Sequence, residues 1–232
     1  MTESLLTFSE NKFDGLEFCS KVYSLFEAIK SSPNGPTRLL MLSSRLEKKL
    51  LEELMPICKY VQSSYRPGRY ISVQWVDGSQ TYDAKIFQKG ELVSQNYYPE
   101  NAHIEITCIK HPKEYLAREL LNEKGIAFGL DGISRLKDRS IESVPFSYSN
   151  VEFISLYSQL IITQITKKST KPYPIDSILI VQCDLNNLYM RNEWFALMEQ
   201  VQENLPKTSF LEIYLYDPVC HYTHSIYPEN NA

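Results

Sequence analysis

The chain has 232 residues, with 24 Lys and Arg against 28 Asp and Glu, so its net charge is −4. Hydrophobic residues make up 43% of the chain and charged residues 22%, as in an ordinary folded protein. This composition excludes a disordered chain, and the negative charge excludes attraction of nucleic acid by overall charge. Any nucleic-acid binding would need a local basic patch.

The cysteines and the N-terminus predict where the protein resides. Five cysteines are scattered along the chain without a C-x-x-C pair, which is typical of reduced thiols in a cytoplasmic protein. The first residues, MTESLLTFSENKF, lack the basic start and apolar run of a secretion signal. No apolar stretch is long enough to span a bilayer. We therefore expect a cytoplasmic protein that does not associate with membranes.

The first half of the chain predicts two helices followed by three strands. Apolar residues at helical spacing predict helices over residues 13–30 and 36–61, and Pro56 is expected to kink or shorten the second. The segment RYISVQW then alternates with the period of a strand, DGSQ predicts a hairpin turn, and TYDAKIFQKG is its antiparallel partner. AHIEITCI is expected to form the third strand of the meander.

The second half predicts helices that alternate with buried strands. A helix begins at Pro112 and ends at Gly125, and residues 126–146 are expected to be irregular. A capping box at Ser149 opens a helix that ends near Lys168. The continuously apolar segment SILIVQC predicts a strand covered on both faces, and a helix over 192–203 leads to the final strand SFLEIYLYD.

This order predicts an α/β fold with one mixed central sheet flanked by helices. An antiparallel three-stranded meander supplies the first part of the sheet, and helical crossovers predict parallel strands for the rest. No linker divides the chain, so we expect one domain over residues 1–232. Within it we expect an N-terminal helical extension (1–35), a core (36–217) and a C-terminal tail (218–232).

Acidic residues on the second and third strands carry a resemblance to a known family. Asp83 lies in TYDAKI, and Glu105 and Thr107 lie in HIEIT. Together with the element order from roughly Arg38 to Asp217, this pattern resembles the PD-(D/E)XK nuclease superfamily. The resemblance implies a restriction-endonuclease-like fold and a catalytic Mg²⁺ or Mn²⁺ bound by Asp83, Glu105 and the backbone carbonyl of Ile106.

One position departs from the family pattern, because Thr107 stands where the family has a catalytic lysine. The resemblance implies that an amine from another element replaces it. The candidate lysines are Lys85, Lys110, Lys167 and Lys168. Some members of the family also use a carboxylate on the helix before the meander, for which Glu47 and Glu52 are the candidates. The alternative is a copy of the fold that has lost its activity.

The chemistry of the two acids agrees with a metal site. Two carboxylates and a carbonyl offer the oxygen ligands that Mg²⁺ and Mn²⁺ prefer, and a metal held there could activate water against a phosphodiester. The alternative is that Asp83 and Glu105 are ordinary solvent-side residues of a half-exposed sheet. The two interpretations differ in whether both side chains meet on one face.

Two clusters of basic residues are candidates for contacts with nucleic acid. Three follow the third strand at the start of a helix, and three lie in the irregular segment; they are Lys110, His111, Lys113, Arg135, Lys137 and Arg139. The first cluster could bind phosphate beside the metal, and the second could form a substrate-gripping loop. The alternative is an exposed helix start and a solvated loop.

The leading hypothesis is a metal-dependent nuclease that hydrolyses phosphodiester bonds of DNA or RNA. The second is a catalytically inactive nuclease fold that acts as a binding or regulatory module, in a bacterial or phage defence setting. The third is a protein–protein adaptor that uses a tyrosine-rich surface, since the chain has 16 Tyr. A protein partner or a homodimer is compatible with each.

Overall fold

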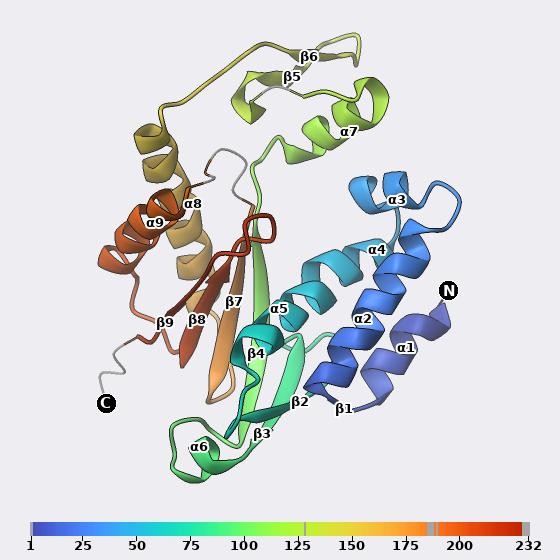
Figure 1. Ribbon diagram of the computed structural model, residues 1–232. Helices are drawn as coiled ribbons and strands as arrows, with labels where there is room; N and C mark the ends of the chain where they lie inside the picture. Colours follow the sequence, from blue (N-terminus) through green and yellow to red (C-terminus); the bar gives the residue numbers. More distant parts are fainter. Residues whose placement is uncertain (1, 128, 185–187, 189, 229–232) are drawn as a thin grey trace.

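A mixed seven-stranded sheet with helices on both faces forms the centre of the molecule (Figure 1). The computed structural model describes residues 2–127, 129–184, 188 and 190–228. The strands of the large sheet are β1 (Phe13–Asp14), β2 (Tyr70–Trp75), β3 (Ala84–Lys89), β4 (Asn101–Ile109), β7 (Ser177–Cys183), β8 (Glu212–Tyr216) and β9 (Thr223–Ile226). A separate hairpin consists of β5 (Ile133–Arg135) and β6 (Ile141–Ser143). The helices are α1 (Thr2–Glu10), α2 (Gly15–Lys30), α3 (Gly35–Met41), α4 (Arg45–Lys49), α5 (Met55–Ser64), α6 (Glu91–Ser94), α7 (Glu114–Lys124), α8 (Asn150–Ser169) and α9 (Arg191–Glu203).

The sheet has the mixed topology that the sequence predicts. β2, β3 and β4 form an antiparallel meander, β4 pairs with β7 and β7 with β8 in parallel, and β9 closes the edge antiparallel to β8. The α/β class, the antiparallel meander with parallel strands and the flanking helices are thereby confirmed. The capping box at Ser149 opens α8 as expected, since Ser149 and Glu152 satisfy each other's backbone N–H groups.

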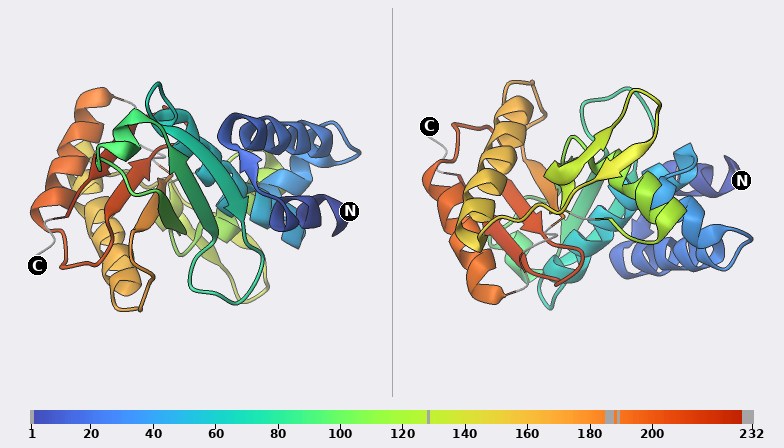
Figure 2. Two further views of the ribbon diagram at one scale, coloured as in Figure 1. Left: turned by 90° about the horizontal axis from the view of Figure 1, so that it is seen from below. Right: turned by 90° about the horizontal axis from the view of Figure 1, so that it is seen from above.

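Two large apolar cores cover opposite faces of the sheet. Residues of α2 and α5 fill the core on one face together with Ile104 and Ile106 of β4. Residues of α8 and α9 fill the core on the other face, together with Ile109 of the same strand. Figure 2 shows these two helical layers on either side of the strands. Because side chains alternate along a strand, β4 contributes to both cores.

The expected long helix over residues 36–61 is broken at a different place from the one predicted. The break follows Met41, where Leu42 takes a positive φ of 49°. From Arg45 the chain stays helical through Pro56, but a π-helical segment, η1 (Leu50–Leu54), precedes that proline. A proline lacks the N–H that continues an α-helical ladder, and a π-turn takes up the resulting mismatch without a break.

Four further segments differ from the expected structure. Residues 126–146, expected to be irregular, contain a 3₁₀ turn, η2 (Leu130–Gly132), and the hairpin β5–β6, which forms a small core with α7 beyond the end of the sheet (Figure 1). The expected tail contains β9, and the loop before β4 contains α6. The expected N-terminal extension contributes Phe8, Phe18 and Val22 to the main core. The short elements α6, β5, β6 and β9 depend on tertiary contacts, since each is too short to predict locally.

Among the described residues, no helix is both long enough and apolar enough to cross a membrane.

Candidate functional site

Asp83 lies directly before β3, and Glu105 lies on the neighbouring antiparallel strand β4. Ala84, the first residue of β3, pairs with Ile104 of β4. The backbone N–H of Asp83 donates to the carbonyl oxygen of Ile104 at 2.7 Å, and Asp83 Oδ2 accepts a hydrogen bond from the backbone N–H of Ile106 at 2.8 Å. These two hydrogen bonds hold Asp83 beside the segment of β4 that contains Glu105. Since Ala84 and Ile104 belong to the core beneath α5, both acids project from the other face.

The electrostatic environment of Asp83 shows an excess of negative charge. Burial raises the pKa of Asp83 to about 7, and the charges of Glu105 and Glu53 also raise it. Two groups lower the pKa of Asp83. They are the backbone N–H of Ile106, which donates to Asp83 Oδ2 at 2.8 Å, and the ammonium group of Lys168. The carboxylates are therefore only partly compensated, and a bound cation would favour the ionised form of Asp83.

Lys168 brings a positive charge to the acids from the last turn of α8. Its ammonium group forms an ion pair with Glu105 and donates a hydrogen bond to the carbonyl oxygen of Ile106 at 3.1 Å. The side chains of Lys168 and Glu105 are only 19% and 11% exposed, so water screens the pair less than a surface ion pair. The hydroxyl of Tyr173 also donates to Glu105, at 3.4 Å. Burial, and then the charge of Glu105, raises the pKa of this phenol.

A third carboxylate, Glu53, approaches from η1. Its Oε2 accepts a hydrogen bond from the indole N–H of Trp75 at 3.1 Å, and its Oε1 pairs with Lys49 at 2.5 Å. Its charge raises the pKa of Asp83, so it belongs to the same electrostatic cluster. We refer to Glu53, Asp83, Glu105 and Lys168 as the acid–lysine cluster.

The two helix carboxylates that the sequence suggested have other partners. Glu47 is fully buried, where it pairs with Arg38 and accepts a hydrogen bond from Ser44. Glu52 pairs with Lys110. Glu53 was not among the carboxylates that the sequence suggested. It lies in the π-helical segment η1, and its contact with Trp75 of β2 joins residues 22 positions apart, which no local pattern shows.

The other candidate lysines do not join the acid–lysine cluster. The ammonium group of Lys85 lies 5.7 Å from the ring centroid of Tyr82, and Lys110 is engaged by Glu52. Lys167 is exposed on α8. Thr107 is buried two residues beyond Glu105 on the same face of β4 and carries no charge. Among the four candidate amines, Lys168 is thus the one that contacts Glu105.

The predicted nucleic-acid contacts do not form one patch beside the acids. Those at the start of α7 bond to acidic or backbone groups: His111 lies 3.3 Å from an oxygen of Asp131, and Lys113 donates to the carbonyl of the same residue at 2.8 Å. Arg135 on β5 pairs with Glu119 of α7 at 2.5 Å. Lys137 and Arg139 are exposed at the tip of the β5–β6 hairpin. The charges of several members are therefore partly neutralised within the protein.

The donor set of the acid–lysine cluster fits a hard divalent cation. Asp83, Glu105 and the carbonyl of Ile106 supply oxygen ligands. Burial, and then the charges of Glu105 and Glu53, raise the pKa of Asp83, and a bound cation would oppose both effects. In the part of the chain that the structure describes, no three His, Cys, Asp or Glu side chains are already arranged around one point as metal ligands. The ammonium group of Lys168 instead contacts both Glu105 and the Ile106 carbonyl, so a metal would have to displace it.

Comparisons of the chain with protein-family models, with curated proteins and with solved structures found no match.

Proposed function

We propose that the protein is a metal-dependent nuclease of the PD-(D/E)XK type, with a restriction-endonuclease-like fold, that hydrolyses phosphodiester bonds of nucleic acid. One observation supports this function above the others. The carboxylate of Asp83 accepts a hydrogen bond from the backbone of Ile106 beside Glu105, and Lys168 supplies from α8 the ammonium group that Thr107 lacks. Two acids, a carbonyl and an amine are the groups that metal-assisted phosphodiester hydrolysis requires.

Each residue of the acid–lysine cluster has a chemical role in this function. Asp83, Glu105 and the carbonyl of Ile106 would hold Mg²⁺ or Mn²⁺. When bound, such a cation polarises the phosphodiester and lowers the pKa of its coordinated water. Lys168, displaced from Glu105, would donate a hydrogen bond to a phosphate oxygen and stabilise the negative charge that develops during hydrolysis. Tyr173 would keep the carboxylate of Glu105 oriented through its hydrogen bond.

A second candidate is a metal-binding or regulatory module without hydrolytic activity. The net charge of −4 and the ion pairs of Lys110 and Arg135 favour this alternative, because they weaken the attraction of a polyanion. The acid–lysine cluster would then be retained for its contribution to the fold or for metal binding alone.

A cleavage assay separates the two functions. Labelled single- and double-stranded DNA and RNA are incubated with the protein in Mg²⁺ or Mn²⁺. The test variants are Asp83→Ala, Glu105→Ala and Lys168→Met. The matched control is Lys167→Met, which removes an exposed ammonium group from the same turn of α8.

Cleavage that is lost in the three test variants and retained in Lys167→Met supports the nuclease. Thermal stabilisation by metal without cleavage of any substrate supports the inactive module. Cleavage that survives Asp83→Ala and Glu105→Ala refutes the assignment of these acids, and a protein that responds neither to metal nor to substrate refutes both functions.

A further inference from the structure

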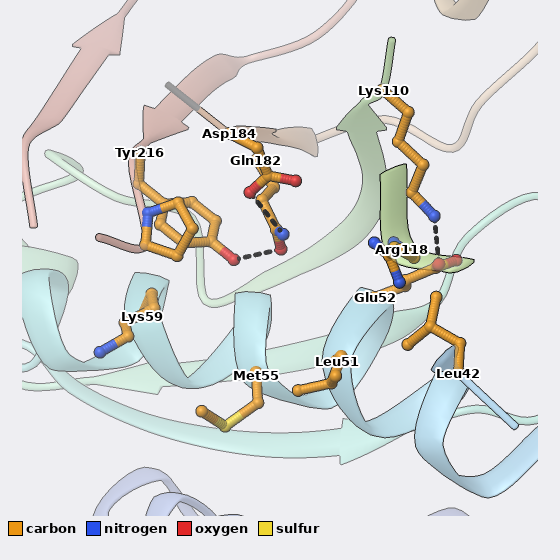
Figure 3. Close-up of a pocket in the computed structure, with 11 residues that line it drawn as sticks. Leu42, Leu51, Glu52, Met55, Lys59, Lys110, Arg118, Gln182, Asp184 and Tyr216 are labelled. Carbon is orange, nitrogen blue, oxygen red and sulfur yellow. Dashed lines mark hydrogen bonds and ion pairs between the residues drawn. The ribbon is translucent and has the colours of Figure 1, made fainter. Parts of the chain in front are cut away.

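A cavity of about 220 Å³ is lined by residues of η1, α5 and the carboxyl ends of β7 and β8 (Figure 3). Glu52 lines this cavity, whereas the next residue, Glu53, belongs to the acid–lysine cluster. The walls come from η1 and α5 on one side and from the carboxyl ends of β7 and β8 on the other. Ligands of open α/β sheets commonly bind at the carboxyl ends of parallel strands.

Two opposed walls of the cavity suit a flat ring. Leu51 and Met55 lie four residues apart in consecutive helical segments, and both side chains line the cavity, joined by Leu42. Tyr216 lines the opposite side (Figure 3). The cavity is smaller than the roughly 300–1,000 Å³ of a site for a drug-sized ligand. It is therefore suited to one planar ring system held between aliphatic and aromatic side chains.

The polar edge of the cavity is an ordered series of hydrogen bonds. The hydroxyl of Tyr216 donates to Gln182 Oε1 at 2.7 Å, and Gln182 Nε2 donates to Asp184 Oδ1 at 3.2 Å. The second oxygen of Asp184 accepts no hydrogen bond from the residues that the structure describes. Burial raises the pKa of Asp184 to about 6, so near neutral pH it is chiefly a carboxylate that can only accept hydrogen bonds.

Several residues that line the cavity are charged, and two of the basic ones are paired with carboxylates. Its basic residues are Lys59, Lys110 and Arg118, against the acids Glu52 and Asp184. Lys110 pairs with Glu52 where strand β4 has ended, and Arg118 reaches in from α7. Arg118 pairs with Glu114 of its own helix. An ammonium group has three N–H donors and a guanidinium group has five, so Lys110 and Arg118 can each donate to a phosphate as well as to these carboxylates.

We propose that this cavity binds a nucleotide whose base carries an exocyclic amino group. The base lies between Met55 and Tyr216, its amino group donates to Asp184, and its phosphate lies near Lys110 and Arg118. The nucleotide is a free mononucleotide or one unstacked residue of a single strand, since both present the same ring, amino group and phosphate. This binding site does not depend on hydrolysis at the acid–lysine cluster.

The test is calorimetric titration of the full chain in the presence of a metal chelator. The ligands are cytidine monophosphate, uridine monophosphate, inorganic phosphate and a short cytosine-containing single strand. Cytidine and uridine differ at the position of the amino group, and we expect cytidine monophosphate to bind about tenfold more tightly. Asp184→Asn should abolish this preference, because an amide can also donate to the uracil carbonyl. The matched control is Glu199→Gln, which neutralises an exposed acid on α9.

A second variant, Leu51→Trp, fills the cavity and should abolish binding of both mononucleotides. If Leu51→Trp does not fold, as judged by circular dichroism, the proposal is tested by Asp184→Asn alone. In that variant the affinities for cytidine monophosphate and uridine monophosphate are compared. Loss of strand binding in these variants identifies a strand residue as the ligand. Binding of the mononucleotide alone identifies the free nucleotide.

Three results would overturn the site: no binding of any nucleotide or strand, equal binding of inorganic phosphate and cytidine monophosphate, or a preference for cytidine that survives Asp184→Asn. Asp83→Ala should bind nucleotide like the wild type. Loss of cleavage with retained nucleotide binding would therefore separate the two sites.

Discussion

The substitution Lys168→Met tests whether an ammonium group occupies the place of a metal ion. Methionine keeps the aliphatic stem and removes the charge that contacts Glu105 and the carbonyl of Ile106. A metal that binds the wild-type protein must first displace these two contacts. In the variant it binds to oxygens that no ammonium group covers, so we expect tighter metal binding together with a loss of cleavage.

The size of the effect follows from the contacts. A hydrogen bond that involves a charged group contributes about 1.5–3 kcal/mol, and about 1.4 kcal/mol corresponds to a tenfold change in Kd. Lys168 makes two such contacts, so we expect the Kd for Mg²⁺ to fall by at least about tenfold. Without metal, Glu105 loses its cationic partner while remaining largely buried, and we expect the free energy of unfolding to fall by about 2 kcal/mol.

Calorimetric titration with Mg²⁺ and Mn²⁺, and urea unfolding in a chelator, measure the two quantities. Lys167→Met is the control, and it should leave both within experimental error because its ammonium group is exposed. An affinity for Mg²⁺ that is unchanged or weaker in Lys168→Met would refute the view that the ammonium group competes with the metal.

Three other changes have defined expected outcomes. Because the pKa of Asp83 is raised from 3.8 to about 7, its neutral form is favoured in the folded protein, and stability without metal should fall as the pH rises from about 4 to about 7. Asp83→Asn should remove this pH dependence and raise the free energy of unfolding at about pH 8 by up to roughly 4 kcal/mol. A variant whose stability depends on pH as the wild type does would contradict this prediction. Glu53→Gln keeps an acceptor for Trp75 but removes a charge, so Mg²⁺ binding should weaken roughly threefold to tenfold in calorimetry; unchanged affinity would place Glu53 outside the site. Gly90→Ala should lower the free energy of unfolding, measured in urea, by at least about 2 kcal/mol. The φ of Gly90 is 121°, and a Cβ at this position would lie 2.6 Å from the carbonyl oxygen of Gly68. A loss below about 0.5 kcal/mol would contradict this prediction.

Local sequence patterns predicted the elements whose signals are self-contained. The capping box at Ser149, the continuously apolar β7 and the alternating β2 each match the structure, because hydrophobic period and capping chemistry are properties of a few neighbouring residues. The antiparallel meander also followed from its turns. These elements suffice to place Asp83 directly before β3 and Glu105 within the neighbouring strand β4.

The rest of the acid–lysine cluster was decided by tertiary structure. Four lysines were equivalent candidates in the sequence, and the packing of α8 across β4 brings Lys168, and not its neighbour Lys167, to Glu105. Glu53 of η1 accepts a hydrogen bond from Trp75, whereas the family resemblance had suggested Glu47 or Glu52. Side-chain direction at such points depends on how an element meets its neighbours, which no local pattern contains.

The cavity proposed to bind a nucleotide and the edge strand β9 also could not be predicted from local sequence patterns. Asp184, Leu51 and Tyr216 lie far apart in the sequence and share no motif, yet the sheet and α5 bring them around one space. β9 is four residues long and gains its structure by pairing with β8. The sequence by itself determined the periodic elements and their order. The tertiary structure decided which side chains meet, because the distances between them depend on packing across the whole sheet.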